Sequence, residues 1–174
     1  MTTTNTTNIP RKTIGTPSPS LSYAARLAFR IIATNPAGQI AISHPWENFR
    51  FRLPGGYTDP STSLHHLAAT RHELEWETGG RIRLVEESPP IACVDEYRDD
   101  VQVHQVTWCY RAELVNVDAD DGVTDEMLNA KLKLEWVDLE EARRRFEKEE
   151  ATAEVGSIIK ERDGFFLEVA SRMS

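Results

Sequence analysis

The sequence contains little cysteine and no long hydrophobic run. Its 174 residues include only two cysteines, Cys93 and Cys109, which lie in two separate apolar segments. No CxxC pair and no paired histidines accompany them, so they do not indicate a zinc site, and two buried, reduced thiols are expected. No apolar stretch approaches the roughly 18 residues that a membrane-spanning helix needs, so the sequence predicts no membrane association.

Positive charge is also scarce. The chain carries 28 acidic and 20 basic residues, which gives a formal net charge of −8. A surface with this balance repels a phosphate backbone, which argues against a nucleic acid polymer as a partner. A small anionic ligand would need local help from a cation or a metal ion.

The first 20 residues lack the apolar core of a secretory signal and are rich in Thr, Ser, Asn and Pro. We expect a flexible arm over residues 1–20 and a cytoplasmic protein. The rest of the chain, 21–174, has the length of one domain with a single hydrophobic core.

The sequence pattern predicts several short strands, one central helix and two helices at the C-terminal end. Runs at 27–34 and 39–43 flank the turn signal Asn-Pro-Ala-Gly and predict a hairpin. A helix is expected over 63–78, after the strand-like "FRFRLPGG". Further strands are expected at 81–87, 89–97, 101–115 and 133–138, a polar loop at 116–126, and helices at 139–150 and 154–173. This order predicts an α/β domain with a mixed sheet between helical layers.

The expected helix over 63–78 has two distinct faces. At about 100° per residue, Leu64, Leu67, Arg71 and Leu74 share one side, and we predict that this side packs on the sheet. A second side carries His66, Thr70, Glu73 and Glu77. The Cβ atoms of Glu73 and Glu77 should lie roughly 5–6 Å apart, so both carboxylates could reach one divalent cation. An acidic pair of this kind more often lies on a solvated surface.

The glycine pair and this helix together resemble the Nudix hydrolases, whose box reads Gx5Ex7REUxEExGU, with U apolar. In "LPGGYTDPSTSLHHLAATRHELEWETGG", Glu73 matches the glutamate of the RE pair, Glu77 the second of the EE pair, and Gly79 the box glycine. The resemblance implies a Nudix-like α/β/α sandwich with a mixed β-sheet. The late segment "LEWVDLEEA" is similar to the family as well.

The box departs from the family pattern at several positions. His72 occupies the arginine position, Trp76 the first glutamate of the EE pair, and Gly80 the final apolar position. The early glutamate position holds Leu64, and the glycine loop is two residues longer than the pattern. One of three helix carboxylates is therefore missing from the metal site that the resemblance implies.

By resemblance, Glu73, Glu77 and the carbonyl of Gly55 would hold Mg²⁺ or Mn²⁺, and a bridging water would attack a pyrophosphate phosphorus. Mg²⁺ accepts waters in place of protein ligands, so a thinned site could still bind it. His66 shares the side of the glutamates and is a candidate for ligation or proton transfer, although such a histidine is more often an ordinary surface residue. The late polar loop is where the family often places a supplementary acid, for which Glu126 is our candidate.

Several residues are candidates for substrate binding. The glycines Gly55 and Gly56 allow the backbone to approach an ion or a phosphate closely. Phe51 could line an apolar leaving group, although alternate strand positions are mostly core. Trp76 could stack on a base, with core or rim packing as the stronger expectation. His104 could point into the cleft from the opposite face of its strand.

Three functions follow from these residues. The first is a metal-dependent pyrophosphohydrolase that acts on a nucleoside diphosphate linked to another moiety, or on a related organic diphosphate. The second is a catalytically silent Nudix fold that binds a ligand or a protein through the same cleft. The third is a Nudix fold that performs other acid–base chemistry, such as isomerisation or cyclisation. The expected partner is a small-molecule diphosphate, and a homodimer is left open.

Overall fold

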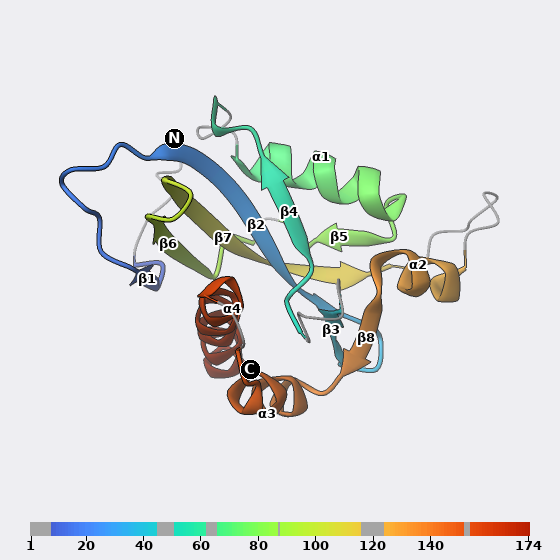
Figure 1. The fold of residues 1–174 in the computed structure, drawn as a ribbon. Helices are drawn as coiled ribbons and strands as arrows, with labels where there is room; N and C mark the ends of the chain where they lie inside the picture. The colour runs from blue at the N-terminus through green and yellow to red at the C-terminus, as the bar shows by residue number, and fades with distance from the viewer. Residues whose placement is uncertain (1–7, 45–50, 62–65, 87, 116–123, 152–153) are drawn as a thin grey trace.

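A computed structural model of the chain describes residues 8–44, 51–61, 66–86, 88–115, 124–151 and 154–174 (Figure 1). The strands are β1 (Arg11–Ile14), β2 (Ala24–Thr34), β3 (Ile40–Ser43), β4 (Gly55–Thr58), β5 (Ile82–Leu84), β6 (Ala92–Arg98), β7 (Val103–Leu114) and β8 (Leu134–Val137). The helices are α1 (His66–Thr78), α2 (Asp125–Leu132), α3 (Leu139–Lys148) and α4 (Glu154–Arg172).

The strands form one mixed sheet in the order β1-β6-β7-β2-β3-β8, with β4 paired to β2 and β5 paired to β7. The long strands β2 and β7 run parallel, as do β1 and β6. The remaining pairs are antiparallel, including β2 with β3, which the turn at 35–38 connects as the sequence predicts. The expected α/β domain with a mixed sheet is therefore confirmed.

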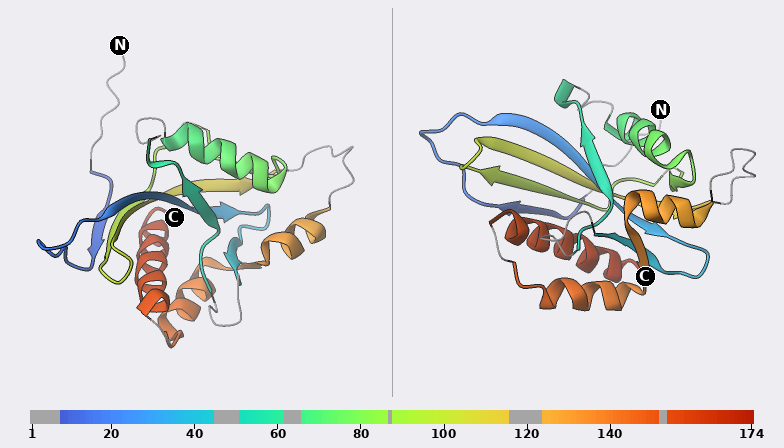
Figure 2. Two further views of the ribbon diagram at one scale, coloured as in Figure 1. Left: turned by 45° about the horizontal axis from the view of Figure 1, so that its top comes forward. Right: turned by 45° about the vertical axis from the view of Figure 1, so that its right-hand side comes forward.

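Helices cover both faces of the sheet. In Figures 1 and 2, α1 lies on one face and α3 and α4 lie on the other. The apolar core follows the same division. Phe29, Ile31, Leu74 and Ile82 belong to the cluster beneath α1, whereas Phe146 and other side chains of α3 and α4 pack on the opposite face. This three-layer arrangement confirms the α/β/α sandwich.

Three segments differ from the sequence prediction. The glycines of "FRFRLPGG" were expected to end a strand but instead begin β4, and Arg52 before them makes only an isolated bridge with Ser43. Residues 11–14 of the expected arm form β1, which pairs with β6 from Arg11 opposite Cys93 to Ile14 opposite Glu96. Helix α2 follows the expected polar loop, where no helix was predicted. Its signal is Thr124, whose hydroxyl accepts a hydrogen bond from the Met127 N–H and so caps the helix.

Both cysteines are buried and free, as expected. Burial raises the pKa of the Cys93 thiol to about 12 and raises that of Cys109 well above its usual value, so both thiols stay protonated at neutral pH. Within the described ranges, no helix is long and apolar enough to cross a bilayer.

Candidate functional site

Helix α1 packs on the sheet through a different side from the predicted one. Its buried residues are His66, Thr70, Leu74 and Thr78, whereas Leu67 is 37% exposed and Arg71 is exposed. Leu64, the remaining member of the predicted stripe, lies outside the described residues. Polar side chains can form the buried stripe because several have partners in the fold: His66 Nδ1 and Tyr110 Oη share a hydrogen bond of 2.8 Å, and Thr78 Oγ1 donates to the Leu74 carbonyl.

This rotation places Glu73 and Glu77 beside the buried stripe, where both are partly buried. The pKa of Glu77 is raised, first because burial disfavours its charged form and then because the Glu73 charge repels it. Lys131 and Arg52 act in the opposite direction but do not cancel these effects. The two glutamates of the predicted pair are therefore close enough for their charges to interact.

Glycines support this part of the fold through strand pairing. Gly55 and Gly56 begin β4 and pair with Arg30 and Phe29 of β2. A Cβ atom on Gly55 would lie 2.0 Å from the Phe29 carbonyl oxygen, and one on Gly56 would lie 3.2 Å from the Phe29 ring. At the other end of α1, Gly79 has φ +60° and turns the chain out of the helix. The glycines matched to the family thus have clear packing and turn roles.

Replacing Gly55 by Ala should lower the free energy of unfolding by about 1–3 kcal/mol, because β4 must move away from β2 to admit the new methyl group. Urea unfolding would measure the loss. Gly164→Ala in α4 is the matched control, since a Cβ there meets nothing within 4 Å and alanine favours the helix. Equal effects at the two positions would contradict close packing at Gly55.

A cavity of about 250 Å³ lies between the end of α1, the start of β4 and the α2–β8 connection. Its charged lining residues are Arg52, Glu77, Lys131 and Lys133. Glu77 and Gly55 therefore line the same cavity, whereas Glu73 is not among its lining residues. The other lining residues are Ile31, Ser43, Pro54, Gly55, Leu74, Thr78, Ile82, Leu132 and Leu134.

Sequence reasoning missed the three cations of this cavity. The sequence predicted an acid, Glu126, from the segment after β7, but Glu126 is exposed on α2 and is not among the residues lining the cavity. Lys131 and Lys133 line it instead, from the end of the same helix. Two features of the sequence could have indicated these cations. They are the basic pattern "KLK" between two apolar segments, and Arg52, whose side chain should point to the opposite side from that of Phe51.

The structure places both candidate histidines away from the cavity. His66 is 6% exposed and stacks on Tyr110, and burial lowers its pKa, so it is a neutral core residue. His104 stacks on Tyr97 and bonds to Asp95 at 3.0 Å. Tyr110 pairs with Ile31, which lines the cavity. His104 lies six residues before Tyr110, which is about 20 Å along β7. Strand length therefore separates His104 from the cleft into which it was predicted to point.

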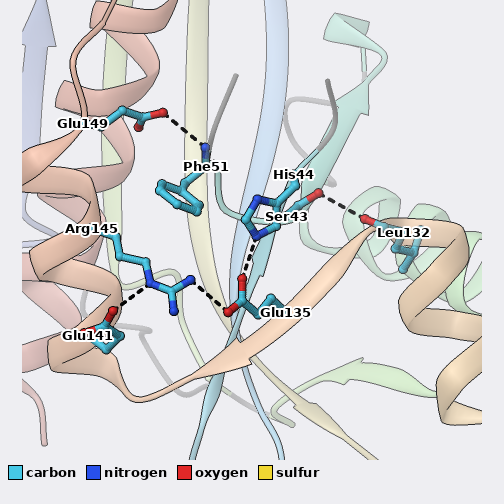
Figure 3. Close-up of polar contacts among 8 residues, drawn as sticks. All are labelled: Ser43, His44, Phe51, Leu132, Glu135, Glu141, Arg145 and Glu149. Atoms are coloured by element: carbon cyan, nitrogen blue, oxygen red, sulfur yellow. Dashed lines mark hydrogen bonds and ion pairs between the residues drawn. The ribbon is translucent and has the colours of Figure 1, made fainter. Parts of the chain in front are cut away.

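Phe51 packs against the core, as strand alternation favours, whereas Trp76 does not take its expected position. Phe51 packs toward α3, with its ring centroid 4.9 Å from that of His44 and 6.2 Å from that of Phe146, and Arg145 lies over it (Figure 3). Strand alternation explains this, because Arg52, its neighbour, lines the cavity. Trp76 is 80% exposed, so the expected core or rim packing is wrong.

The donor atoms near Glu77 suit a hard divalent cation but are few. Within the described part of the chain, no group of three or more His, Cys, Asp or Glu side chains is placed to hold a metal ion. The two carboxylates are the oxygen ligands that Mg²⁺ and Mn²⁺ prefer, and Mg²⁺ keeps several waters in most protein sites. The residues present therefore fit a metal ion with a thinned protein shell.

No protein-family model and no curated protein matches the sequence. Among solved structures, the MutT protein from Methanosarcina mazei Go1 is 17% identical, with a TM-score of 0.47 over 84% of this chain and 98% of that chain. The MutT NUDIX hydrolase from Burkholderia pseudomallei is 20% identical, with a TM-score of 0.45 over 79% and 97% of the two chains. The Ap4A hydrolase from C. elegans is 17% identical, with a TM-score of 0.45 over 82% and 99%. The likeness is one of fold.

Proposed function

We propose that this chain is a Nudix-type hydrolase that cleaves the diphosphate group of a small organic ligand, such as a nucleoside diphosphate linked to another moiety. The observation that carries the proposal is the Glu73–Glu77 pair. It is partly buried, its charges repel, and Glu77 faces a cavity that also contains Gly55. Repulsion between two half-buried carboxylates costs stability, and a ligand-bearing divalent cation would relieve it.

Glu73 and Glu77 would hold Mg²⁺ or Mn²⁺, with the Gly55 carbonyl as a further oxygen ligand. When bound, such an ion neutralises phosphate charge and lowers the pKa of a water that attacks phosphorus. The chain's own residues fix where this happens. The α1 packing contacts at Thr70 and Leu74 orient the two glutamates, and pairing of β4 with β2 sets the position of Gly55.

Metal binding provides the first test. Calorimetric titration of Mg²⁺ or Mn²⁺ should show binding to the native protein that the Glu73→Gln/Glu77→Gln variant loses. Glu77 must be ionised to act as a ligand, and its pKa is raised. Binding should therefore weaken on acidification at a higher pH than an ordinary glutamate, with a pKa of about 4.3, would require.

Protonation of Glu77 has the opposite effect on folding stability from its effect on metal binding. Without metal, the contribution of Glu77 to stability is fully present below the unfolded-state pKa and is lost as pH rises through the raised folded-state pKa. The metal-free protein should thus gain stability from protonation of Glu77, and Mg²⁺ should restore stability at neutral pH. Metal binding that is equal in the native protein and the double variant would remove the proposal.

A second candidate is binding of the same ligand class without hydrolysis. The small donor set favours it, because within the described part of the chain no group of three or more His, Cys, Asp or Glu side chains is placed to hold a metal ion. A phosphate-release screen over nucleoside diphosphate compounds with Mg²⁺ and Mn²⁺ separates the two. Turnover of any compound establishes the hydrolase, whereas metal or ligand binding without turnover establishes the silent form.

A further inference from the structure

The cavity beside Glu77 has a charge opposite to that of the whole chain. Three of its charged lining residues are cations, Arg52, Lys131 and Lys133, and one is an anion, Glu77. The protein as a whole carries a net charge of −8. A local excess of positive charge inside a cavity attracts anions more strongly than the same charges would on an open surface.

The three cations come from segments that the fold holds together. Backbone hydrogen bonds in both directions, at 2.8 and 3.0 Å, join Arg52 to Ser43 at the end of β3. Lys131 lies in the last turn of α2, and its Nζ donates to the Glu77 carbonyl at 2.9 Å. That contact uses one of the three N–H donors of a lysine, so the ammonium can also contact a ligand.

Lys133 is fixed in an unusual backbone conformation. Its φ of +51° lies in the left-handed region that residues other than glycine seldom adopt. Its carbonyl accepts a hydrogen bond from the His44 N–H at 3.0 Å, and the preceding carbonyl, of Leu132, accepts one from the Ser43 hydroxyl at 3.1 Å (Figure 3). This conformation ends α2, where Lys133 is the C-cap and its N–H bonds to the Ala130 and Asn129 carbonyls, so the residue holds a defined position at the edge of the cavity.

A buried arginine increases the positive charge behind the cavity. Arg30 is 4% exposed, lies against Gly55, and has an Nε without a hydrogen-bond partner among the described residues. Arg30 therefore adds a buried positive charge directly behind Gly55 and the cavity.

We propose that Arg52, Lys131 and Lys133 form a phosphate clamp that holds the diphosphate end of the ligand independently of any metal ion. This inference rests on the proposed function for the choice of diphosphate as the anion. At about 250 Å³, the cavity is smaller than the roughly 300–1,000 Å³ of typical ligand sites. It therefore encloses the phosphates, and the organic moiety extends out of it.

The test measures binding of inorganic pyrophosphate by calorimetry in EDTA, at low ionic strength. The clamp variant is Lys131→Gln/Lys133→Asn, in which both side chains become neutral and asparagine keeps the left-handed conformation accessible. Arg144→Gln/Lys148→Gln on α3 is the matched control, since it removes two exposed cations far from the cavity. We expect the native protein and the control to bind pyrophosphate, and the clamp variant to bind at least about tenfold more weakly.

Several results would overturn the clamp: no pyrophosphate binding in EDTA, an equal loss in clamp and control variants, or equally tight binding of the dicarboxylate malonate. Parallel titration of the Glu73→Gln/Glu77→Gln variant separates this inference from the proposed function. Pyrophosphate binding that survives in that variant supports the clamp even if no hydrolysis is found. Hydrolysis by the native protein without metal-free pyrophosphate binding would support the enzyme and overturn the clamp.

Discussion

Glu77→Gln is expected to reduce Mg²⁺-dependent hydrolysis of a diphosphate substrate by about 10²–10³-fold, the usual loss when one electrostatic group of a catalytic site is removed. The neutral amide is nearly isosteric but is a poor ligand for Mg²⁺. Only one negative charge would then remain in the Glu73–Glu77 pair. A phosphate-release assay at saturating Mg²⁺, on whichever diphosphate compound the native protein turns over, measures the effect.

The matched control is Glu75→Gln, which removes a carboxylate from an exposed position of the same helix. Its activity should remain close to native. Stability provides an independent check, because Glu77→Gln removes like-charge repulsion from Glu73 and should raise the free energy of unfolding by about 0.2–0.5 kcal/mol without metal. Activity and stability therefore move in opposite directions. Undiminished turnover in Glu77→Gln would contradict the proposed role of Glu77 in metal-dependent hydrolysis.

Much of the fold follows from periodicity and turn chemistry in the sequence. Alternation of apolar residues identifies β6 and β7, and the Asn-Pro-Ala-Gly turn identifies the hairpin of β2 and β3. The amphipathic pattern of α3, with Ala142 and Phe146 buried, is equally clear. These features are local, because each depends on neighbours within one element or one turn.

The orientation of α1 could not be predicted in the same way. Hydrophobicity favours the side with Leu67, but the fold buries His66 and Thr70. Burial of those polar residues depends on partners from a distant strand, such as Tyr110, whose position is set by the whole sheet. The glutamate pair was nevertheless identified, because a spacing of four residues keeps two side chains together on whichever side faces the sheet.

The cations of the cavity were missed for a related reason. Arg52 precedes Lys131 by 79 positions, and they line one cavity only because β3 connects the segment before β4 to the α2–β8 connection. The spacing of these residues in the sequence does not predict that they line the same cavity. Strand β1 was missed because its four residues have too few apolar side chains to indicate a strand, and pairing with β6 stabilises it.

Arg162→Met is expected to give the largest loss of stability, about 3–5 kcal/mol, because it leaves two buried carboxylates without their cation. Arg162 is 3% exposed, and its guanidinium donates to Asp163 at 2.7 Å and to Glu96 at 3.0 Å. Burial acts to lower the pKa of Arg162, but the two carboxylates outweigh it and raise that pKa. Chemical denaturation at neutral pH, compared with the native protein, measures the loss.

The control is Arg172→Met, which removes an exposed arginine from the same helix and the ion pair with Glu168. Surface changes of this kind stay within about 0.5 kcal/mol. A loss at Arg162 no larger than that at Arg172 would show that the buried network is dispensable for folding. The network also reaches the candidate site, because Asp163 accepts a hydrogen bond of 2.8 Å from the Leu53 N–H, two residues before Gly55. Any Arg162→Met protein that remains folded should therefore bind metal and pyrophosphate more weakly, since Asp163 would lose the guanidinium that holds the carboxylate to which Leu53 is anchored.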